Sequence, residues 1–160
     1  GSRFVYVVDI SGSMRGDKLN LLKRELKESI NAMPDNGQFL IVFFESEAVP
    51  IHRRERWIDA SAKNKKEAAV AIDAIEARGG TNPAPAFVIG LSLRPKPDAV
   101  YFMTDGLFED TVVDRVLQMN RGASKVPVHC LSLVDRASEP LMRRLAQETG
   151  GTYHHIESTR

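Results

Sequence analysis

The stretch FVYVVDISGSM, residues 4–14, determines the expected fold of this chain. Its apolar first half predicts a buried strand, and a polar string follows where that strand ends. Gly12 permits the backbone to curl after the strand without a Cβ clash, so that Asp9, Ser11 and Ser13 turn toward one point. One carboxylate and two hydroxyls that face one point are hard oxygen ligands of the kind that divalent cations prefer. The strand end is therefore a candidate cation site.

Two later segments carry chemistry that completes such a site. Residues 78–83, Arg-Gly-Gly-Thr-Asn-Pro, place the Thr81 hydroxyl on a glycine-rich loop. Residues 100–106, Val-Tyr-Phe-Met-Thr-Asp-Gly, predict a second apolar strand that ends in Asp105. If the strands that carry Asp9 and Asp105 lie side by side and parallel, both carboxylates emerge at one sheet edge, where α/β folds bind their ligands. Two carboxylates that close repel each other until a cation lies between them.

Together these three elements resemble the von Willebrand factor type A (VWA) domain, which carries a metal-ion-dependent adhesion site, or MIDAS. The resemblance rests on D-x-S-x-S at residues 9–13, Gly-Gly-Thr at 79–81 and Thr-Asp-Gly at 104–106, in that order. Each piece follows a predicted strand or precedes a predicted helix, which is the context that short motifs need. The expected ion is Mg²⁺, with Mn²⁺ and Ca²⁺ as alternatives. The resemblance implies one metal site, held by Asp9, Ser11, Ser13, Thr81 and Asp105.

The rest of the chain alternates between helical and strand patterns. We predict helices at residues 19–33, 65–77, 82–93, 111–120 and 139–148. Besides the two strands already described, we predict strands at residues 39–44, 48–51, 126–134 and 152–156. This alternation is typical of a three-layer, doubly wound, Rossmann-like α/β domain with a mainly parallel sheet and helices on both faces. Residues 48–51 are expected to form one short antiparallel edge strand, because Pro50 is unwelcome in a central one. We expect the strand order to reverse between the strands of Asp9 and Asp105.

Composition narrows the class of protein. A chain of 160 residues that is 42% hydrophobic is long enough for one domain, residues 3–160, with a single substantial core. The net charge of +1, from 22 Lys and Arg against 21 Asp and Glu, argues against a nucleic-acid partner, because phosphate contacts need a basic excess. Cys130 is the single cysteine, and its apolar neighbours predict a core residue rather than a nucleophile. No stretch has the apolar length of a transmembrane helix, so we expect no membrane insertion by this domain. We also expect the isolated domain to be monomeric.

The two ends of the chain carry further expectations. Gly1-Ser2, directly before a core strand, is interpreted as an expression remnant, so we expect the domain to be excised from a longer protein of undetermined compartment. VWA domains usually continue after the last strand into a C-terminal helix, which couples to the metal site in switching members. The chain ends at residues 156–160 without a helical pattern, so we do not extend the resemblance to that switch.

Two exposed-looking motifs have ordinary interpretations beside functional ones. Arg-Gly-Asp at residues 15–17 is the tripeptide that integrins bind, but Asp17 directly before an amphipathic helix is explained as a cap or first-turn carboxylate. Residues 52–57, His-Arg-Arg-Glu-Arg-Trp, make a local basic patch together with nearby lysines. A partner surface and a solvated loop with Trp57 packed on the sheet edge are both consistent with this patch, and the loop is favoured.

The donor set favours binding over catalysis. Two carboxylates and three hydroxyls do not saturate a six-coordinate ion, so water or an outside oxygen is expected at the remaining position. The resemblance implies that a Glu or Asp of a protein partner enters there. We therefore predict a cation-dependent, non-enzymatic protein-interaction module.

Two alternatives belong to other classes. A Mg²⁺-dependent phosphohydrolase of the haloacid-dehalogenase type would use Asp9 as its nucleophile. Such enzymes carry a second Asp two residues later as acid/base, where this chain has Ser11, and no lysine is evident near Asp105. The remaining alternative is a scaffold domain in a longer chain.

Overall fold

Apolar runs form the centre of the sheet. The computed structural model describes residues 2–122 and 124–157. In it, β1 (Arg3–Asp9), β2 (Gln38–Phe44) and β5 (Ala99–Thr104) are buried along most of their length. Strands buried on both faces are expected where helices cover a parallel sheet from both sides. The apolar run that opens the chain is therefore the middle of the core.

The sheet order places the first strand at a switch point. The order is β3-β2-β1-β5-β6-β7, with β4 also paired to β2. β1 runs parallel to both β2 and β5, and the parallel ladder continues through β6 (Val128–Leu133) and β7 (Tyr153–Ile156). The chain thus winds outward from β1 in one direction, returns, and then winds in the other. The predicted reversal between the strands of Asp9 and Asp105 is confirmed.

Antiparallel pairing is confined to one edge. β3 (Ala48–Pro50) pairs antiparallel with the end of β2, as predicted for the segment with Pro50. A second antiparallel strand, β4 (Ile58–Asp59), pairs with the start of β2 and was not predicted, because two residues are too short to display a strand pattern. The fold class, a three-layer doubly wound domain, is confirmed.

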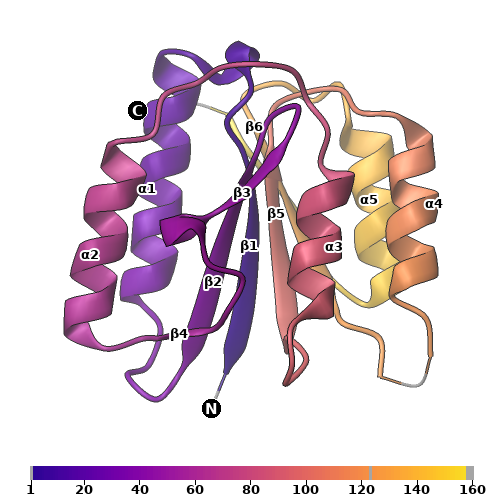
Figure 1. Cartoon of the computed structure of the whole chain (residues 1–160). Coiled ribbons are helices and arrows are strands. Elements are labelled where there is room, and N and C mark those ends of the chain that lie inside the picture. The colour runs from indigo at the N-terminus through magenta and orange to yellow at the C-terminus, as the bar shows by residue number, and fades with distance from the viewer. Residues whose placement is uncertain (1, 123, 158–160) are drawn as a thin grey trace.

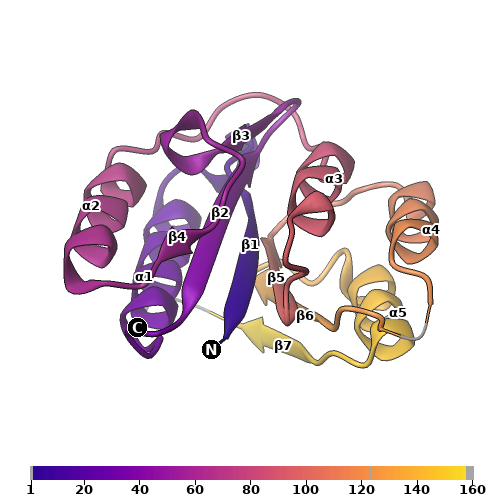
Figure 2. The ribbon, with the colours of Figure 1, turned by 60° about the horizontal axis from the view of Figure 1, so that its bottom comes forward.

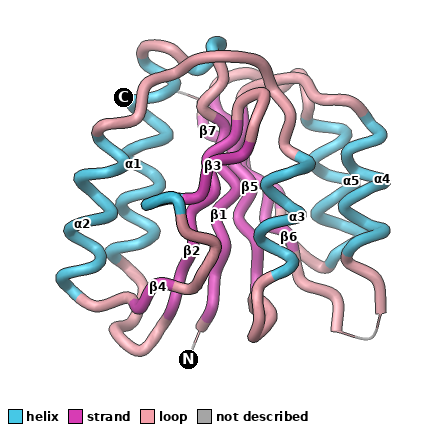
Figure 3. Tube along the Cα trace, in the orientation of Figure 1, coloured by secondary structure: helices cyan, strands magenta, loops and turns pink. Residues whose placement is uncertain are grey.

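Helices cover both faces of this sheet (Figure 1). They are α1 (Asp17–Asn31), α2 (Ala62–Asp73), α3 (Ala84–Ser92), α4 (Asp110–Met119) and α5 (Glu139–Thr149). Figure 2 shows α1 and α2 on one face and α3, α4 and α5 on the other. Short 3-10 turns, η1 (Gly12–Met14) and η2 (Ile51–Arg53), follow β1 and β3. The connections after β1 and β2 and the segment before α3 gather at one end of the sheet (Figure 3).

In α1, which follows β1, the apolar residues that repeat every three or four positions are the buried ones. Leu19, Leu22, Leu26 and Ile30 of α1 are buried at three- and four-residue steps, as the periodicity predicts. Burying each such side chain contributes about 1.5–3 kcal/mol relative to leaving it exposed. Gly16 precedes the helix with a φ of 87°, a conformation that side chains disfavour. Asp17 is then a first-turn carboxylate, as interpreted.

Helix α2 differs from its predicted range for a local reason. It begins at Ala62 and not at residue 65, because the Ser61 hydroxyl accepts a hydrogen bond from the Asn64 backbone N–H at 3.2 Å. A serine in this position caps the free N–H groups of the first turn. The helix ends at Asp73, short of residue 77.

Further predictions concern Cys130, membrane-spanning helices and the two ends of the chain. Cys130 is 1% exposed and lies in the core as predicted. No helix within residues 2–122 and 124–157 has the length and apolar character needed to cross a membrane. The expected expression remnant at residue 1 and the chain end at 158–160 lie outside the described residues.

Candidate metal centre

The two aspartates emerge side by side at the carboxyl edge of the sheet. Asp9 is the last residue of β1, and Asp105 directly follows β5. The two strands are paired in register, with Val8 opposite Met103, so their ends are level. Asp9 is 0% and Asp105 is 2% exposed. Two acidic side chains are therefore held almost out of water at the switch point, where doubly wound folds bind their ligands.

Both oxygens of the Asp9 carboxylate are fixed by hydrogen bonds. The Ser11 backbone N–H donates to Oδ1 at 2.8 Å, and the Thr104 hydroxyl donates to Oδ2 at 2.6 Å. Burial raises the pKa of Asp9, although the bonds from Ser11 and Thr104 favour its ionised form, and the charge of Asp105 raises it further. Within the part of the chain that the structure describes, no cationic side chain donates a hydrogen bond to the Asp9 carboxylate.

Asp105 is held by a hydroxyl and by an ammonium group. The Ser13 hydroxyl donates to Oδ1 at 3.0 Å, and Lys18 Nζ donates to Oδ2 at 2.8 Å. The Asp105 side chain is 1% exposed and that of Lys18 is 29% exposed. The hydrogen bond to Asp105 is the main cause that raises the pKa of Lys18. The ammonium therefore neutralises a buried carboxylate from the solvent side.

The prediction that no lysine lies near Asp105 is wrong. Lys18 is remote from Asp105 in sequence, but it sits in the first turn of α1, which starts beside the loop after β1. Its position among other charged residues of an amphipathic helix resembles that of an ordinary solvated lysine. The sequence does contain one signal for this contact. Lys18 follows Asp9 by only nine residues, and a loop this short keeps the start of the helix near the end of the strand.

The loop that carries Thr81 is fastened to the loop after β1. The Arg78 backbone N–H donates to the Ile10 carbonyl at 2.9 Å, and the Gly12 N–H donates to the Gly79 carbonyl at 3.0 Å. A Cβ built on Gly106 would lie 3.7 Å from Asp9 Oδ2 and 3.8 Å from Thr81 Oγ1. The Thr81 hydroxyl and the Asp9 carboxylate therefore face the same small space beside Gly106.

All of the predicted site residues are thus brought together. The Ser11 and Ser13 hydroxyls lie 3.2 Å apart and continue toward Asp105. Ser11 is buried, whereas Ser13 is exposed and Thr81 is half-buried. The cluster is closed on the side of the sheet and open toward solvent.

The donor set fits a hard divalent cation. Carboxylate and hydroxyl oxygens are the ligands that Mg²⁺ and Ca²⁺ take, and the buried pair already attracts one positive charge, that of Lys18. Within the part of the chain that the structure describes, no group of three or more His, Cys, Asp and Glu gathers at one point. The two aspartates would therefore have to be complemented by the hydroxyls and by outside oxygens.

The fold and the cluster together define a class: a doubly wound α/β domain with an oxygen-rich cluster at its switch point. Comparison with known families gives the same assignment, because the profile of the von Willebrand factor type A domain matches residues 2–155. The chain belongs to the VWA family.

Several individual proteins are similar to this chain in sequence or in fold. Inter-alpha-trypsin inhibitor heavy chain H4 of Sus scrofa is 36% identical over 89 residues, which are 56% of this chain and 9% of that protein. The Homo sapiens heavy chain H4 is 27% identical over 169 residues, 95% of this chain and 18% of that protein. The structure of a VWA protein from Catenulispora acidiphila matches with a TM-score of 0.86 at 21% identity, covering 97% of this chain and 38% of that one. The chain thus spans less than a fifth of the heavy chains that it matches.

Proposed function

We propose that this domain binds a protein partner through a divalent cation, Mg²⁺ in the first instance. The observation that carries the proposal is the pair of buried carboxylates, Asp9 and Asp105, at an edge that is open on one side through Ser13 and Thr81. Domains of this family mediate protein–protein interactions. Metal dependence and the acidic contact are the proposed parts.

Each residue of the cluster has a role in this proposal. The ligand oxygens would come from the carboxylates and hydroxyls of Asp9, Ser11, Ser13, Thr81 and Asp105. When bound, the cation supplies a concentrated positive charge with a free position for a hard anionic oxygen. Thr104 orients the Asp9 carboxylate through its bond to Oδ2. In the metal-free domain, Lys18 orients the Asp105 carboxylate through its bond to Oδ2.

The surroundings of the cluster favour a protein partner. A hollow of about 690 Å³ adjoins Thr81 and is lined by Leu107, Phe108 and Val112 together with Glu109. Leu107 is 67% exposed, so its apolar side chain is accessible to a partner. A partner whose acidic residue reaches the cation would place a neighbouring apolar side chain in this hollow.

The phosphohydrolase alternative has less support. Lys18 supplies a positive charge near Asp105, but the position two residues after Asp9 is Ser11, whose hydroxyl contacts that of Ser13. A serine in this arrangement offers no group to protonate a leaving group. Turnover of a chromogenic phosphate ester with Mg²⁺ that is lost in Asp9→Ala would favour the enzyme.

Cation binding is tested by calorimetry and by thermal unfolding with and without Mg²⁺. We expect Mg²⁺ to raise the melting temperature of the wild type and to leave Asp9→Ala unchanged, because a ligand that binds only the folded state stabilises it. Asp73→Ala is the matched control, since Asp73 is a 57% exposed carboxylate on α2. Equal Mg²⁺ shifts in wild type and Asp9→Ala would contradict the proposal.

Partner binding is tested by capture from the source organism in parallel with Mg²⁺ and with chelator. We expect the partner to be lost with chelator and when one particular Glu or Asp of the partner is changed to Ala. A specific partner retained equally in both conditions would place the recognition surface elsewhere.

A further inference from the structure

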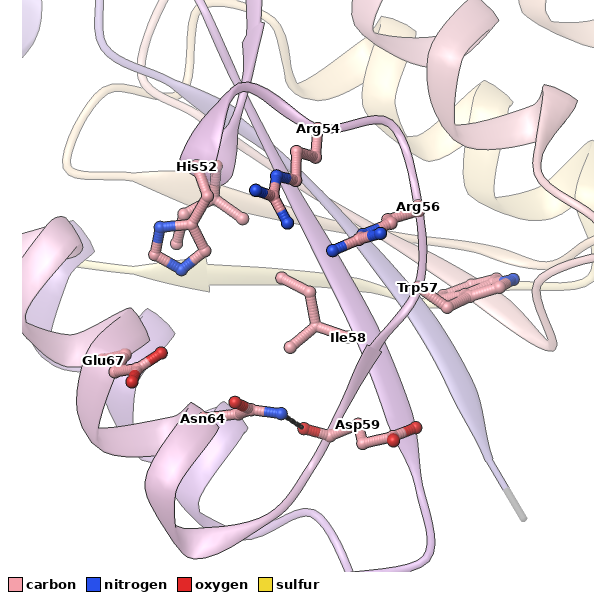
Figure 4. Close-up of a pocket in the computed structure, with 9 residues that line it drawn as sticks. His52, Arg54, Arg56, Trp57, Ile58, Asp59, Asn64 and Glu67 are labelled. Atoms are coloured by element: carbon pink, nitrogen blue, oxygen red, sulfur yellow. Dashed lines mark hydrogen bonds between the residues drawn. The ribbon is translucent and has the colours of Figure 1, made fainter.

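A second hollow lies on the flank of the sheet, between α2 and the segment that joins β3 to β4. It has a volume of about 590 Å³, and its lining includes His52, Arg54, Arg56, Ile58 and Glu67. Figure 4 shows the Arg54 and Arg56 guanidinium groups directed over Ile58 into this space. None of its lining residues belongs to the candidate metal centre.

Two arginines share this hollow. Arg54 is extended, with φ −129° and ψ 128°, and the chain bends at Arg56. The guanidinium groups of both residues are directed into the hollow (Figure 4). Glu55, which lies between them in sequence, does not line it. The two cationic groups therefore face the hollow without the acidic residue that lies between them in sequence.

Neither guanidinium group has a protein partner among the described residues. Within residues 2–122 and 124–157, the Arg54 and Arg56 side chains donate no hydrogen bond and form no ion pair, although the Arg54 backbone N–H donates to the Ile51 carbonyl. Exposed arginines elsewhere do: Arg78 Nε lies 2.7 Å from Glu45 Oε2, and Arg144 Nη2 lies 2.7 Å from Asp114 Oδ1. Two unpaired guanidinium groups directed into one hollow repel each other, and an anion between them would remove that repulsion.

The segment that presents the arginines is held in a fixed shape. His52 and Arg53 have positive φ values of 58° and 57°, a left-handed conformation that costs free energy for residues other than glycine. Ile51 is 2% exposed and anchors the segment at one end. At the other end, Trp57 Nε1 donates to the Pro95 carbonyl at 2.9 Å and Ile58 pairs with β2. A loop held at both ends loses little freedom when a ligand binds.

The hollow is polarised and not uniformly basic. Asp59 also lines it, but its carboxylate accepts a hydrogen bond from Gln38 Nε2 at 2.9 Å. Glu67 lies on the opposite wall, on α2 (Figure 4). An anionic group is therefore favoured on the arginine side, and a hydrogen-bond donor or cation on the side of Glu67.

We propose that this hollow binds an oxyanion, a phosphate or carboxylate group of a ligand, between the guanidinium groups of Arg54 and Arg56. The planar guanidinium presents paired N–H donors that match two oxygens of such a group. This site is independent of the candidate metal centre, so the partner proposed there and the anion proposed here can be tested separately.

The test uses the one tryptophan of the chain, Trp57, which lines the hollow. The protein is titrated in chelator with inorganic phosphate and, in a second arm, with acetate, each against chloride at constant ionic strength. Trp57 fluorescence and the backbone amide NMR shifts of residues 51–59 report binding. We expect saturable changes confined to this segment, and the tighter of the two anions identifies the chemistry.

Variants distinguish a specific anion site from a general effect of positive charge on the protein surface. We expect Arg54→Gln/Arg56→Gln to weaken anion binding at least tenfold. The matched control Arg115→Gln/Arg121→Gln removes the same charge from exposed arginines outside the hollow and is expected to change binding less than twofold. Glu67→Gln is expected to tighten binding about threefold, and it remains informative if the double variant folds poorly. Absence of saturable binding in the wild type, or equal weakening by both double variants, would overturn the proposal.

Discussion

Replacing Lys18 with Met is expected to destabilise the metal-free domain by about 2 kcal/mol. Lys18 Nζ lies 2.8 Å from Asp105 Oδ2, so the substitution leaves a carboxylate that is 1% exposed with the Ser13 hydroxyl as its remaining side-chain partner. Removing one partner of a buried ion pair costs about 3–5 kcal/mol, whereas an exposed pair is worth about 0–1 kcal/mol. The Lys18 side chain is 29% exposed, which places the expected loss between these ranges.

The assay is urea unfolding in chelator, with a control on the same helix. Lys27 Nζ lies 2.7 Å from Asp73 Oδ1, with side chains that are 33% and 57% exposed. Lys27→Met therefore removes an ion pair of nearly the same length that water already screens, and it should lower the free energy of unfolding by under about 1 kcal/mol. The difference between the two variants measures the effect of burial at Asp105.

Adding Mg²⁺ extends the same prediction. A ligand at about 100 times its dissociation constant stabilises the folded state by about 2.7 kcal/mol. We expect Lys18→Met to gain more from Mg²⁺ than the wild type, because the Lys18 ammonium no longer competes for Asp105. If Lys18→Met loses no more than Lys27→Met in chelator, or if Mg²⁺ stabilises wild type and Lys18→Met equally, Lys18 does not act as the counter-ion of Asp105.

Three further outcomes are expected. Burial raises the pKa of Asp9, so the metal-free wild type binds more protons folded than unfolded, and its stability relative to Asp9→Asn should fall as pH rises above about 4. Urea unfolding in chelator measures this difference, and a constant difference would contradict the prediction. Thr104→Val removes the 2.6 Å hydrogen bond to Asp9 Oδ2, so it should lower the free energy of unfolding in urea by about 1–3 kcal/mol and weaken Mg²⁺ binding. Unchanged stability would count against the role of Thr104. Burial also raises the pKa of Cys130, so a thiol reagent should modify it only in denaturant, and rapid labelling of the native protein would refute this.

The parts of the fold that sequence predicts are those encoded by long local patterns. The apolar runs of β1 and β5 and the periodicity of α1 each extend over more than one turn or pleat repeat, so they specify both the type of element and its buried face. The positions of Asp9 and Asp105 then follow, because strand ends in a doubly wound sheet have a known edge.

The parts that sequence does not predict depend on contacts between distant segments. Lys18 looks like any charged residue of an amphipathic helix, and only the placement of the first turn of α1 beside the end of β5 brings it to Asp105. The β4 strand exists because two residues meet the start of β2, which no local pattern encodes. The basic segment at residues 52–57 was interpreted as a loop, and Trp57 does pack on the core, but the left-handed turn that directs its arginines is a property of the tertiary structure.

The hydrogen bond between Thr104 and Asp9 joins residues 95 positions apart. Asp9 is synthesised early, and the local Ser11 N–H bonds its Oδ1, yet its Oδ2 gains the Thr104 partner only when β5 has been inserted beside β1. Contacts of such long sequence separation require most of the chain to be in place, because loop closure must precede them. An N-terminal fragment that stops before residue 99 would lack β5 and therefore half of the carboxylate pair. Cation uptake by the nascent chain is thus expected only after β5 has been inserted beside β1, so it would report the pairing of these two strands during synthesis.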